Sequence, residues 1–188
     1  MKYLYPCKPN PLSLESKFFE ELDRDTGWIA EIKKNGWRCL VYCDTGLTLW
    51  TRHNTIISEP LDAIRDSLRA VPDKTVLDGE LVHFRTETKG VLYLFDILIY
   101  KGKLLVDLTL SERRKFLEEV HSRLTGIEIA IQVRVGKKEL YRQAITAGDE
   151  GVVLKKLSSK YLCSDKRCLQ NPFWLKVKKI ENHIKVGG

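Results

Sequence analysis

Two adjacent lysines, Lys33 and Lys34, lie between two β-rich runs and are followed by Asn35-Gly36 and Arg38. A lysine amine is a nucleophile only when deprotonated, and its unperturbed pKa of about 10.4 keeps it protonated at neutral pH. Neighbouring cations and partial burial both lower that pKa. This stretch therefore contains a candidate nucleophile, provided that the fold surrounds one of the two amines with positive charge.

Strand alternation distinguishes the two lysines. Successive side chains of a strand point to opposite faces, so Glu31 and Lys33 share one face and Lys34 takes the other. If the face of Glu31 lines a pocket, Lys33 is the lysine that reacts. The same alternation places Lys176 and Lys178 on one face of a later strand.

Further charged residues fit chemistry on a nucleotide. Arg38, Lys176 and Lys178 would lower the pKa of a neighbouring lysine and neutralise a triphosphate. Glu80 lies in an apolar run, where burial of an unpaired carboxylate is costly, so we expect it to meet a cation or a ligand. Glu80 and Glu150 could carry a divalent metal, because oxygen ligands and phosphates suit Mg²⁺.

A purely structural interpretation of the same stretch is also open. Asn-Gly between two β-rich runs is a strong hairpin signal, because both residues tolerate the positive φ of a type I′ turn. We therefore predict a hairpin of strands 28–33 and 37–43, continued into a meander by a third strand, 47–51. On this interpretation alone, the charges of Lys33, Lys34 and Arg38 are simply solvated.

The remaining elements alternate between strands and helices. We predict strands at 75–84, 91–100, 127–133, 150–155 and 173–178, a short amphipathic helix within 9–25, a helix capped by Ser58, a helix opened by the capping box of Thr109 and Glu112, and a helix at 137–147. Antiparallel meanders with helices outside them indicate an α+β domain.

Composition indicates a soluble globular domain with an anionic partner. The 188 residues are 43% hydrophobic and 30% charged, and 32 Lys+Arg against 25 Asp+Glu give a net charge of +7, which suits a polyanion. The apolar runs are too short to span a bilayer and the amino terminus lacks a signal peptide, so we expect an intracellular protein, cytoplasmic or nucleoid-associated. The five cysteines lack metal-site spacing, which predicts reduced and mostly buried thiols and leaves a Cys163–Cys168 pairing as a weaker alternative.

Six segments in order resemble the motifs of the covalent nucleotidyltransferases, the superfamily of ATP-dependent DNA and RNA ligases and mRNA capping enzymes. The segments are 33–38 (K-x-(D/N)-G-x-R), 52–54 (R-x-G type), 78–80 (D-G-E), 94–96 (F-D), 150–155 (E-G-x-x-x-K) and 174–178 (W-x-K-x-K). Within the superfamily, residues 77–82, 110–114 and 150–153 are similar to bacterial end-joining DNA ligases.

The resemblance implies a fold and a reaction. The fold is an antiparallel-sheet nucleotidyltransferase (adenylation) domain of the ATP-grasp-like DNA ligase type, with helices packed outside the sheets. Lys33 would attack the α-phosphate of ATP, release pyrophosphate and keep AMP in a phosphoamide bond. AMP would then pass to a 5′-phosphate at a nick or break, and the neighbouring 3′-hydroxyl would displace it, with DNA favoured over RNA.

The resemblance also assigns roles to the other site residues. Glu31 would lie near the adenine and Phe95 would stack on it, while Arg38 and Arg52 would contact ribose and phosphate. Glu80 would bind a ribose hydroxyl or the metal, and Glu150 would bind Mg²⁺. Charge on the transferring phosphate would be stabilised by Lys155, Lys176 and Lys178.

The chain departs from the superfamily pattern in two motifs and in length. Asn35 replaces the commoner aspartate, and the Arg52 segment lacks its usual glycine. We expect residues 1–27 to be an amino-terminal segment with a short helix in the same domain, 28–180 to be the nucleotidyltransferase domain, and 181–188 to be a tail or the start of an interdomain hinge. We expect no OB-fold domain in this chain, and hence an excised domain, or a minimal enzyme that works alone or with a separate OB-fold or end-binding protein.

Other functions fit some of these features. An RNA ligase or a capping-type guanylyltransferase would use residues 33–38 equally well, the latter with GTP. A degenerate module that binds nucleotide or nucleic acid without chemistry is also possible, although the intact Lys33, Glu80 and Glu150 argue against decay.

Overall fold

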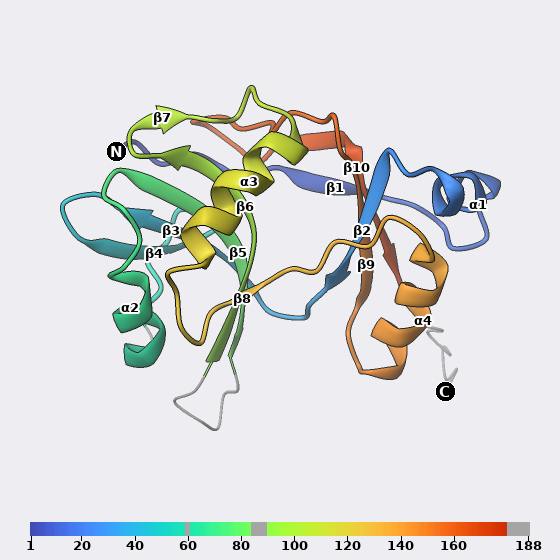
Figure 1. Ribbon diagram of the computed structural model, residues 1–188, viewed down its shortest axis with the longest axis horizontal. Helices are drawn as coiled ribbons and strands as arrows, with labels where there is room; N and C mark the ends of the chain where they lie inside the picture. Colours follow the sequence, from blue (N-terminus) through green and yellow to red (C-terminus); the bar gives the residue numbers. More distant parts are fainter. Residues whose placement is uncertain (59–60, 84–89, 180–188) are drawn as a thin grey trace, which may run out of the picture.

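Two β-sheets of different size form the molecule, and helices cover the outside of each (Figure 1). The computed structural model describes residues 1–58, 61–83 and 90–179. Its elements are β1 (Lys8–Pro11), α1 (Lys17–Arg24), β2 (Trp28–Lys33), β3 (Trp37–Cys43), β4 (Leu47–Thr51), α2 (Asp62–Leu68), β5 (Thr75–His83), β6 (Gly90–Tyr100), β7 (Lys103–Leu104), α3 (Leu110–His121), β8 (Glu128–Ile129), α4 (Lys137–Thr146), β9 (Gly151–Lys156) and β10 (Gln170–Lys178).

The larger sheet has six strands and carries α2 and α3. Its order is β4-β3-β5-β6-β7, with β8 beside β6; the pairs are antiparallel except β6 with β8. Alternate residues of β3, such as Cys39 and Val41, pack in one apolar cluster with Leu117 and Val120 of α3. Burial of the apolar stripe of α3 therefore fixes it on β6, which places Asp96 beneath this helix.

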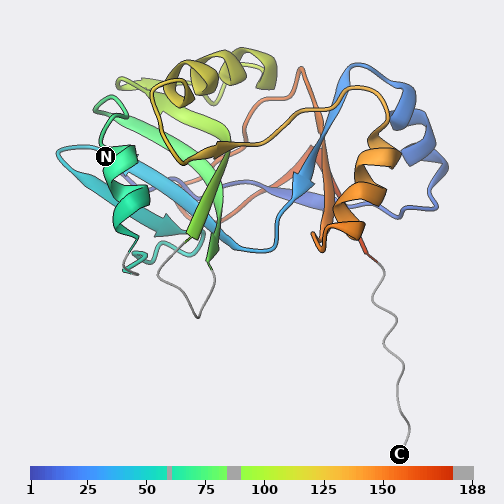
Figure 2. The same cartoon turned by 60° about the horizontal axis from the view of Figure 1, so that its bottom comes forward.

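The smaller sheet has four strands in the order β1-β10-β9-β2 and packs against α1 and α4 (Figure 2). β9 pairs antiparallel with both β2 and β10, whereas β1 pairs parallel with β10. The segment 1–27 thus contributes β1 to this sheet and α1 to the helices that pack against it. A third apolar cluster, which includes Leu40, Leu98 and Trp174, joins the two sheets.

The predicted hairpin around Asn35-Gly36 is wrong. β2 pairs with β9 in the smaller sheet, whereas β3 pairs with β4 and β5 in the larger one, so residues 34–36 cross between sheets. Neither Asn35 nor Gly36 has a positive φ. Gly36 is needed for another reason: a Cβ there would lie 2.4 Å from the backbone oxygen of Leu81, so this crossing needs the close approach that only glycine allows.

Other local predictions had mixed outcomes. The bounds of β2, β3 and β4 and the capping box of Thr109 with Glu112 are confirmed. The Ser58 cap is wrong, because α2 begins at Asp62 with Leu61 before it and without a side-chain capping bond. The strand predicted at 127–133 is too long: the structure has only the two-residue strand β8 and, further along, an isolated bridge between Val133 and Ala30. Phe84, the turn at 85–89 and the tail at 181–188 lie outside the described residues.

Two predictions from composition concern cysteines and membranes. All five cysteines, which lie in the described part of the chain, carry free thiols, and three of them are buried. Among the described residues, the helices are all too short or too polar to cross a membrane.

Candidate active site

Two adjoining hollows lie where the sheets face each other. The first, of about 230 Å³, is bordered by Glu31, Phe95, Lys155, Trp174 and residues 128–131. The second, of about 620 Å³, is bordered by Arg52, Glu150, Lys176 and Lys178. Lys33 and Glu80 border both hollows, so the candidate nucleophile lies at their junction.

Lys33 ends β2, and its Nζ lies 2.8 Å from Oε2 of Glu150. Lys34 instead pairs with Asp149 at 2.8 Å and lies over the ring of Tyr93. The two lysines thus have different carboxylate partners. Lys34 nevertheless also borders the first hollow, so strand alternation did not exclude it from the cleft.

Glu150 is held in place by backbone and side-chain contacts. Its backbone N–H donates to the carbonyl of Lys33, and its own carbonyl accepts from Lys179. The next residue, Gly151, has φ 139°, and a Cβ on it would lie 2.0 Å from the oxygen of Val177, so β9 and β10 could not approach this closely with another residue there.

Three lysines surround the carboxylate of Glu150. It forms ion pairs with Lys33 and Lys178, and Lys176 lies in the same hollow. Burial acts to raise the pKa of Glu150, but hydrogen bonds from Lys178 and Lys33 outweigh it and lower this pKa. Burial, aided by the charges of Lys178 and Lys33, lowers the pKa of Lys176.

Arg52 borders the second hollow from the loop after β4. Its Nε contacts Nε2 of His53 at 3.0 Å. Asn54, at the position where the related motif has glycine, has φ 61°, in the left-handed region that asparagine tolerates better than most residues. The loop that presents Arg52 therefore contains a left-handed backbone conformation at an asparagine.

Aromatic rings and a buried ion pair form the first hollow. Glu31 is 3% exposed, and its Oε2 lies 2.6 Å from Nζ of Lys155. That ammonium lies over the rings of Phe95, at 4.6 Å, and Trp174, at 4.3 Å. The hollow thus offers aromatic rings beside carboxylates that include Glu31, an environment that suits a nitrogenous base.

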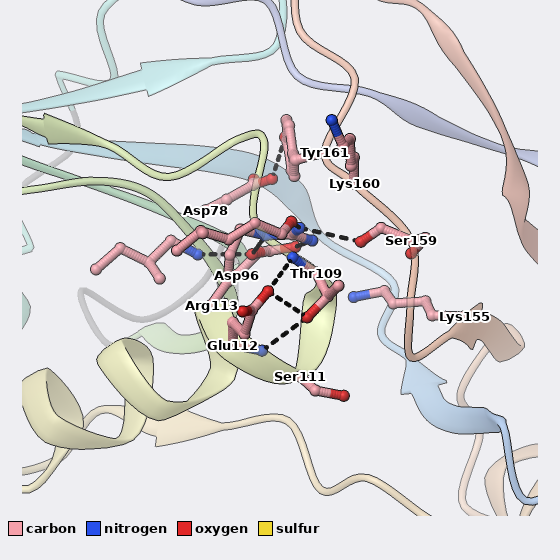
Figure 3. Close-up of polar contacts among 12 residues, drawn as sticks. Asp78, Asp96, Thr109, Ser111, Glu112, Arg113, Lys155, Ser159, Lys160 and Tyr161 are labelled. Carbon is pink, nitrogen blue, oxygen red and sulfur yellow. Dashed lines mark hydrogen bonds and ion pairs between the residues drawn. The ribbon is translucent and has the colours of Figure 1, made fainter.

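Arg38 forms a bidentate ion pair with Asp78, with both N···O distances 2.5 Å, and lies over the ring of Phe95 (Figure 3 shows Asp78 with Tyr161). Tyr161 donates a hydrogen bond to Asp78. Burial acts to lower the pKa of Arg38, and the charge of Asp78 outweighs it. Asp78 therefore compensates the charge of Arg38 at the edge of the hollow.

Glu80 faces both hollows. Burial is the main cause that raises its pKa, against the opposing charges of Arg38 and Lys33. In the described part of the chain, no group of three or more His, Cys, Asp or Glu side chains is arranged to hold a metal ion. Any metal between Glu80 and Glu150 would therefore need further oxygen ligands from a bound phosphate or water.

Comparison with known proteins identifies the family. A family model described as the ATP dependent DNA ligase domain matches residues 83–178, half of the chain. The chain belongs to this ATP-dependent DNA ligase family.

Individual relatives agree with this assignment. The DNA ligase of Thermococcus fumicolans is 32% identical over 178 residues, which cover 79% of this chain and 30% of that protein. DNA ligase 2 of Methanosarcina acetivorans is 42% identical over 169 residues, covering 70% of this chain and 28% of that protein. This ligase-family chain thus spans about a third of the length of such curated relatives.

The fold also matches solved ligase structures. A mycobacterial DNA ligase D complexed with ATP and MES superposes with a TM-score of 0.74 at 22% identity, over 93% of this chain and 60% of that one. This confirms the predicted α+β fold of antiparallel sheets with helices outside them.

Sequence reasoning missed several residues that build the ligase-family cleft. Gln132 contacts Glu31, Asp149 contacts Lys34, and Tyr161 contacts Asp78. Of these three, only Asp149 could have been found from the sequence: it adjoins Glu150 just as Lys34 adjoins Lys33, which suggests a second lysine–carboxylate pair. Gln132 and Tyr161 lie in segments without a motif, so only the folded chain reveals them.

Proposed function

We propose that this chain forms a covalent lysyl-AMP on Lys33 and uses it to seal breaks in a nucleic acid, with DNA favoured over RNA. The position of the Lys33 amine carries the proposal. This amine lies between a hollow suited to a base and a hollow rich in cations. An ATP molecule with its base in the first and its phosphates in the second would present its α-phosphate to Lys33.

The proposed reaction has three steps. The deprotonated amine of Lys33 attacks the α-phosphorus, an N–P bond forms, and the bond to the bridging oxygen breaks as pyrophosphate leaves. An oxygen of a 5′-phosphate then attacks the same phosphorus and frees Lys33. Finally the neighbouring 3′-hydroxyl attacks the 5′-phosphorus, the strand is joined and AMP departs.

The other site residues have supporting roles in the proposal. Glu31 and Phe95 contact the adenine, Arg38 and Arg52 contact ribose and phosphate, and Glu80 contacts a ribose hydroxyl or a metal. Lys155, Lys176 and Lys178 stabilise charge on the transferring phosphate, although Lys155 borders the first hollow and the other two border the second.

Glu80 and Glu150 would hold Mg²⁺ in the second hollow. Two carboxylates facing one hollow fit an ion that takes its remaining ligands from phosphate and water. Once bound, Mg²⁺ neutralises charge on the phosphates and makes pyrophosphate a better leaving group. The chain's own contribution is to present the carboxylates and lysines in fixed positions.

The proposed substrate is a nucleic acid with a 5′-phosphate at a nick or break, and the net charge of +7 favours such a polyanion. A separate OB-fold or end-binding protein is a candidate partner. Residues 28–180 form the proposed nucleotidyltransferase domain, with 1–27 as part of it and 181–188 as a tail or hinge. We place the protein inside the cell, in the cytoplasm or at the nucleoid.

Labelling tests the proposal directly. The protein is incubated with Mg²⁺ and α-labelled ATP or GTP, denatured, and assayed for retained label. We expect label from ATP in the natural chain, none in Lys33→Ala, and label in Lys34→Ala, because Lys34 has the same chemistry but pairs with Asp149 instead of Glu150.

Other outcomes would redirect or end the proposal. Label from GTP alone would indicate a capping-type enzyme. Label that persists in Lys33→Ala and disappears in Lys34→Ala would identify Lys34 as the nucleophile and contradict the proposal. Failure of the labelled protein to join a nicked duplex, even with an OB-fold domain added, would restrict the function to nucleotide transfer.

A further inference from the structure

Gln132 contacts the carboxylate that faces the base hollow. Its Nε2 donates a 2.9 Å hydrogen bond to Oε1 of Glu31, while Lys155 pairs with Oε2 at 2.6 Å. Each oxygen of Glu31 therefore has one fixed neighbour. Lys155 alone would hold a single oxygen and leave the carboxylate free to turn about its last torsion angle.

The segment that carries Gln132 is itself fixed on both sides. We call residues 128–133 the strap; its residues 128–131 border the first hollow. Ala130 donates to the carbonyl of Leu94 in β6, and its own carbonyl accepts from Arg114. Val133 and Ala30 exchange two backbone hydrogen bonds of 2.8 and 2.9 Å, which places Gln132 opposite Glu31.

A carboxylate held in this way is selective because it only accepts hydrogen bonds when ionised. Adenine presents a 6-amino donor, whereas a 6-oxopurine such as guanine presents an acceptor at the same position. A 6-amino group would satisfy the free lone pairs of Glu31. A 6-oxo group would place its acceptor oxygen against the acceptor oxygens of Glu31 in a buried site. This repulsion would weaken the binding of 6-oxopurine nucleotides.

We propose that Gln132 is a positioning residue that orients Glu31 so that the first hollow selects 6-aminopurine nucleotides over 6-oxopurine nucleotides. The inference rests on the proposed function, which places the base in this hollow. Gln132 itself is only partly buried. Its replacement therefore leaves the core clusters intact and acts on Glu31.

The test compares three nucleotides and two pairs of variants. Binding of ATP, purine riboside triphosphate and inosine triphosphate is measured by calorimetry, and lysyl-nucleotide formation by labelling. The variants are Gln132→Ala and Gln132→Glu. Matched controls are Gln143→Ala and Gln143→Glu, because Gln143 also donates to a glutamate, Glu139, but on the exposed face of α4.

We expect the natural chain to prefer ATP over inosine triphosphate by about tenfold to hundredfold, with purine riboside triphosphate between them, since one unpaired buried acceptor is at stake. Gln132→Ala should reduce this ratio about three- to tenfold, and Gln132→Glu at least as much because two carboxylates repel. The ATP concentration for half-maximal labelling rate should rise with the maximal rate nearly unchanged, because the base lies away from the reacting phosphorus. The Gln143 variants should retain the natural ratio.

Several results would overturn the inference. Equal binding of ATP and inosine triphosphate by the natural chain would show that the hollow is not selective. An unchanged ratio of ATP to inosine triphosphate binding in both Gln132 variants would show that Gln132 does not orient Glu31. Equal loss of all three nucleotides with a lowered melting temperature would make Gln132 structural. Selective binding of ATP without any covalent label would contradict the proposed lysyl-AMP reaction but support the role of Gln132. The proposed function and this inference can therefore fail separately.

Discussion

Glu80 and Glu150 face the same hollow, but their surroundings shift their pKa values in opposite directions. Burial raises the pKa of Glu80, whereas hydrogen bonds from Lys178 and Lys33 lower that of Glu150. A glutamate with a raised folded-state pKa stabilises the fold most at low pH, and this contribution is lost as pH rises through that pKa. One with a lowered pKa contributes stability that is lost as pH falls.

We therefore expect Glu80→Gln to raise the melting temperature at pH 7 to 8 by about 2–4 °C, the shift produced by roughly 1 kcal/mol in a protein of this size. The gain should shrink as pH falls toward the ordinary glutamate range. Formation of lysyl-AMP should decrease in the same variant, because the carboxylate is part of the proposed site. Thermal unfolding from pH 5 to 8, followed by circular dichroism, measures the first effect.

Glu150→Gln is the matched comparison, for which we expect a change in melting temperature of the opposite sign. Its melting temperature should fall at pH 7, because two lysines lose a charged partner, and the difference should narrow toward acid pH. If the two variants shift in the same direction at every pH, the assigned electrostatic environments are incorrect.

At the scale of elements, Arg113 anchors α3 through a fully buried ion pair. It contacts both oxygens of Asp96 at 2.7 and 2.9 Å and donates to the carbonyls of Leu108 and Ser159 (Figure 3). Ser159 in turn accepts from Trp174, which borders the base hollow. This chain of contacts links α3 and β6 to the connection between β9 and β10.

Arg113→Met should lower the stability by about 3–5 kcal/mol, because it leaves the charge of Asp96 buried and unpaired. Arg123→Met is the control just beyond the end of the same helix: its pair with Glu119 is exposed, so a change of at most about 1 kcal/mol is expected. Urea unfolding of the two variants measures the difference. Equal losses would mean that the Asp96 pair contributes no more than a surface pair.

The sequence predicted strands better than it predicted their partners. The limits of β2 and β3 follow from local residue patterns, but β2 pairs with β9, which begins at Gly151. Asn-Gly indicated a local turn, whereas Gly36 is required by a contact with Leu81 that arises only in the folded chain. Such nonlocal contacts leave no periodic pattern in the sequence. The motif residues could be found without them, but Gln132 could not.

In the described part of the molecule, the two sheets meet through the apolar cluster that includes Leu40, Leu98 and Trp174, and both border the cleft. A nucleotide in this cleft would touch both sheets and so stabilise them together. At 100 times its Kd, ATP should stabilise the fold by about 2.7 kcal/mol. That corresponds to a rise in melting temperature of roughly 5–11 °C for a chain of this size.

The Lys33→Ala variant suits this measurement, because we expect it to bind ATP without forming the covalent lysyl-AMP. Far-ultraviolet circular dichroism and tryptophan fluorescence should report one transition that moves with ATP, since Trp50 lies in the larger sheet and Trp174 in the smaller. Two transitions, of which only one moves, would show that the nucleotide is bound by a single sheet.

The pairing of β2 with β9 has a consequence for synthesis on the ribosome. A nascent chain that has emerged only as far as β8 already contains Lys33 and Phe95, but it lacks Glu150 and Lys178. Neither the neighbouring strand of Lys33 nor its counter-charge exists at that stage. We therefore expect the proposed lysine to accept AMP only after β9 and β10 have joined the sheet, and a fragment that ends at β8 to form no lysyl-AMP.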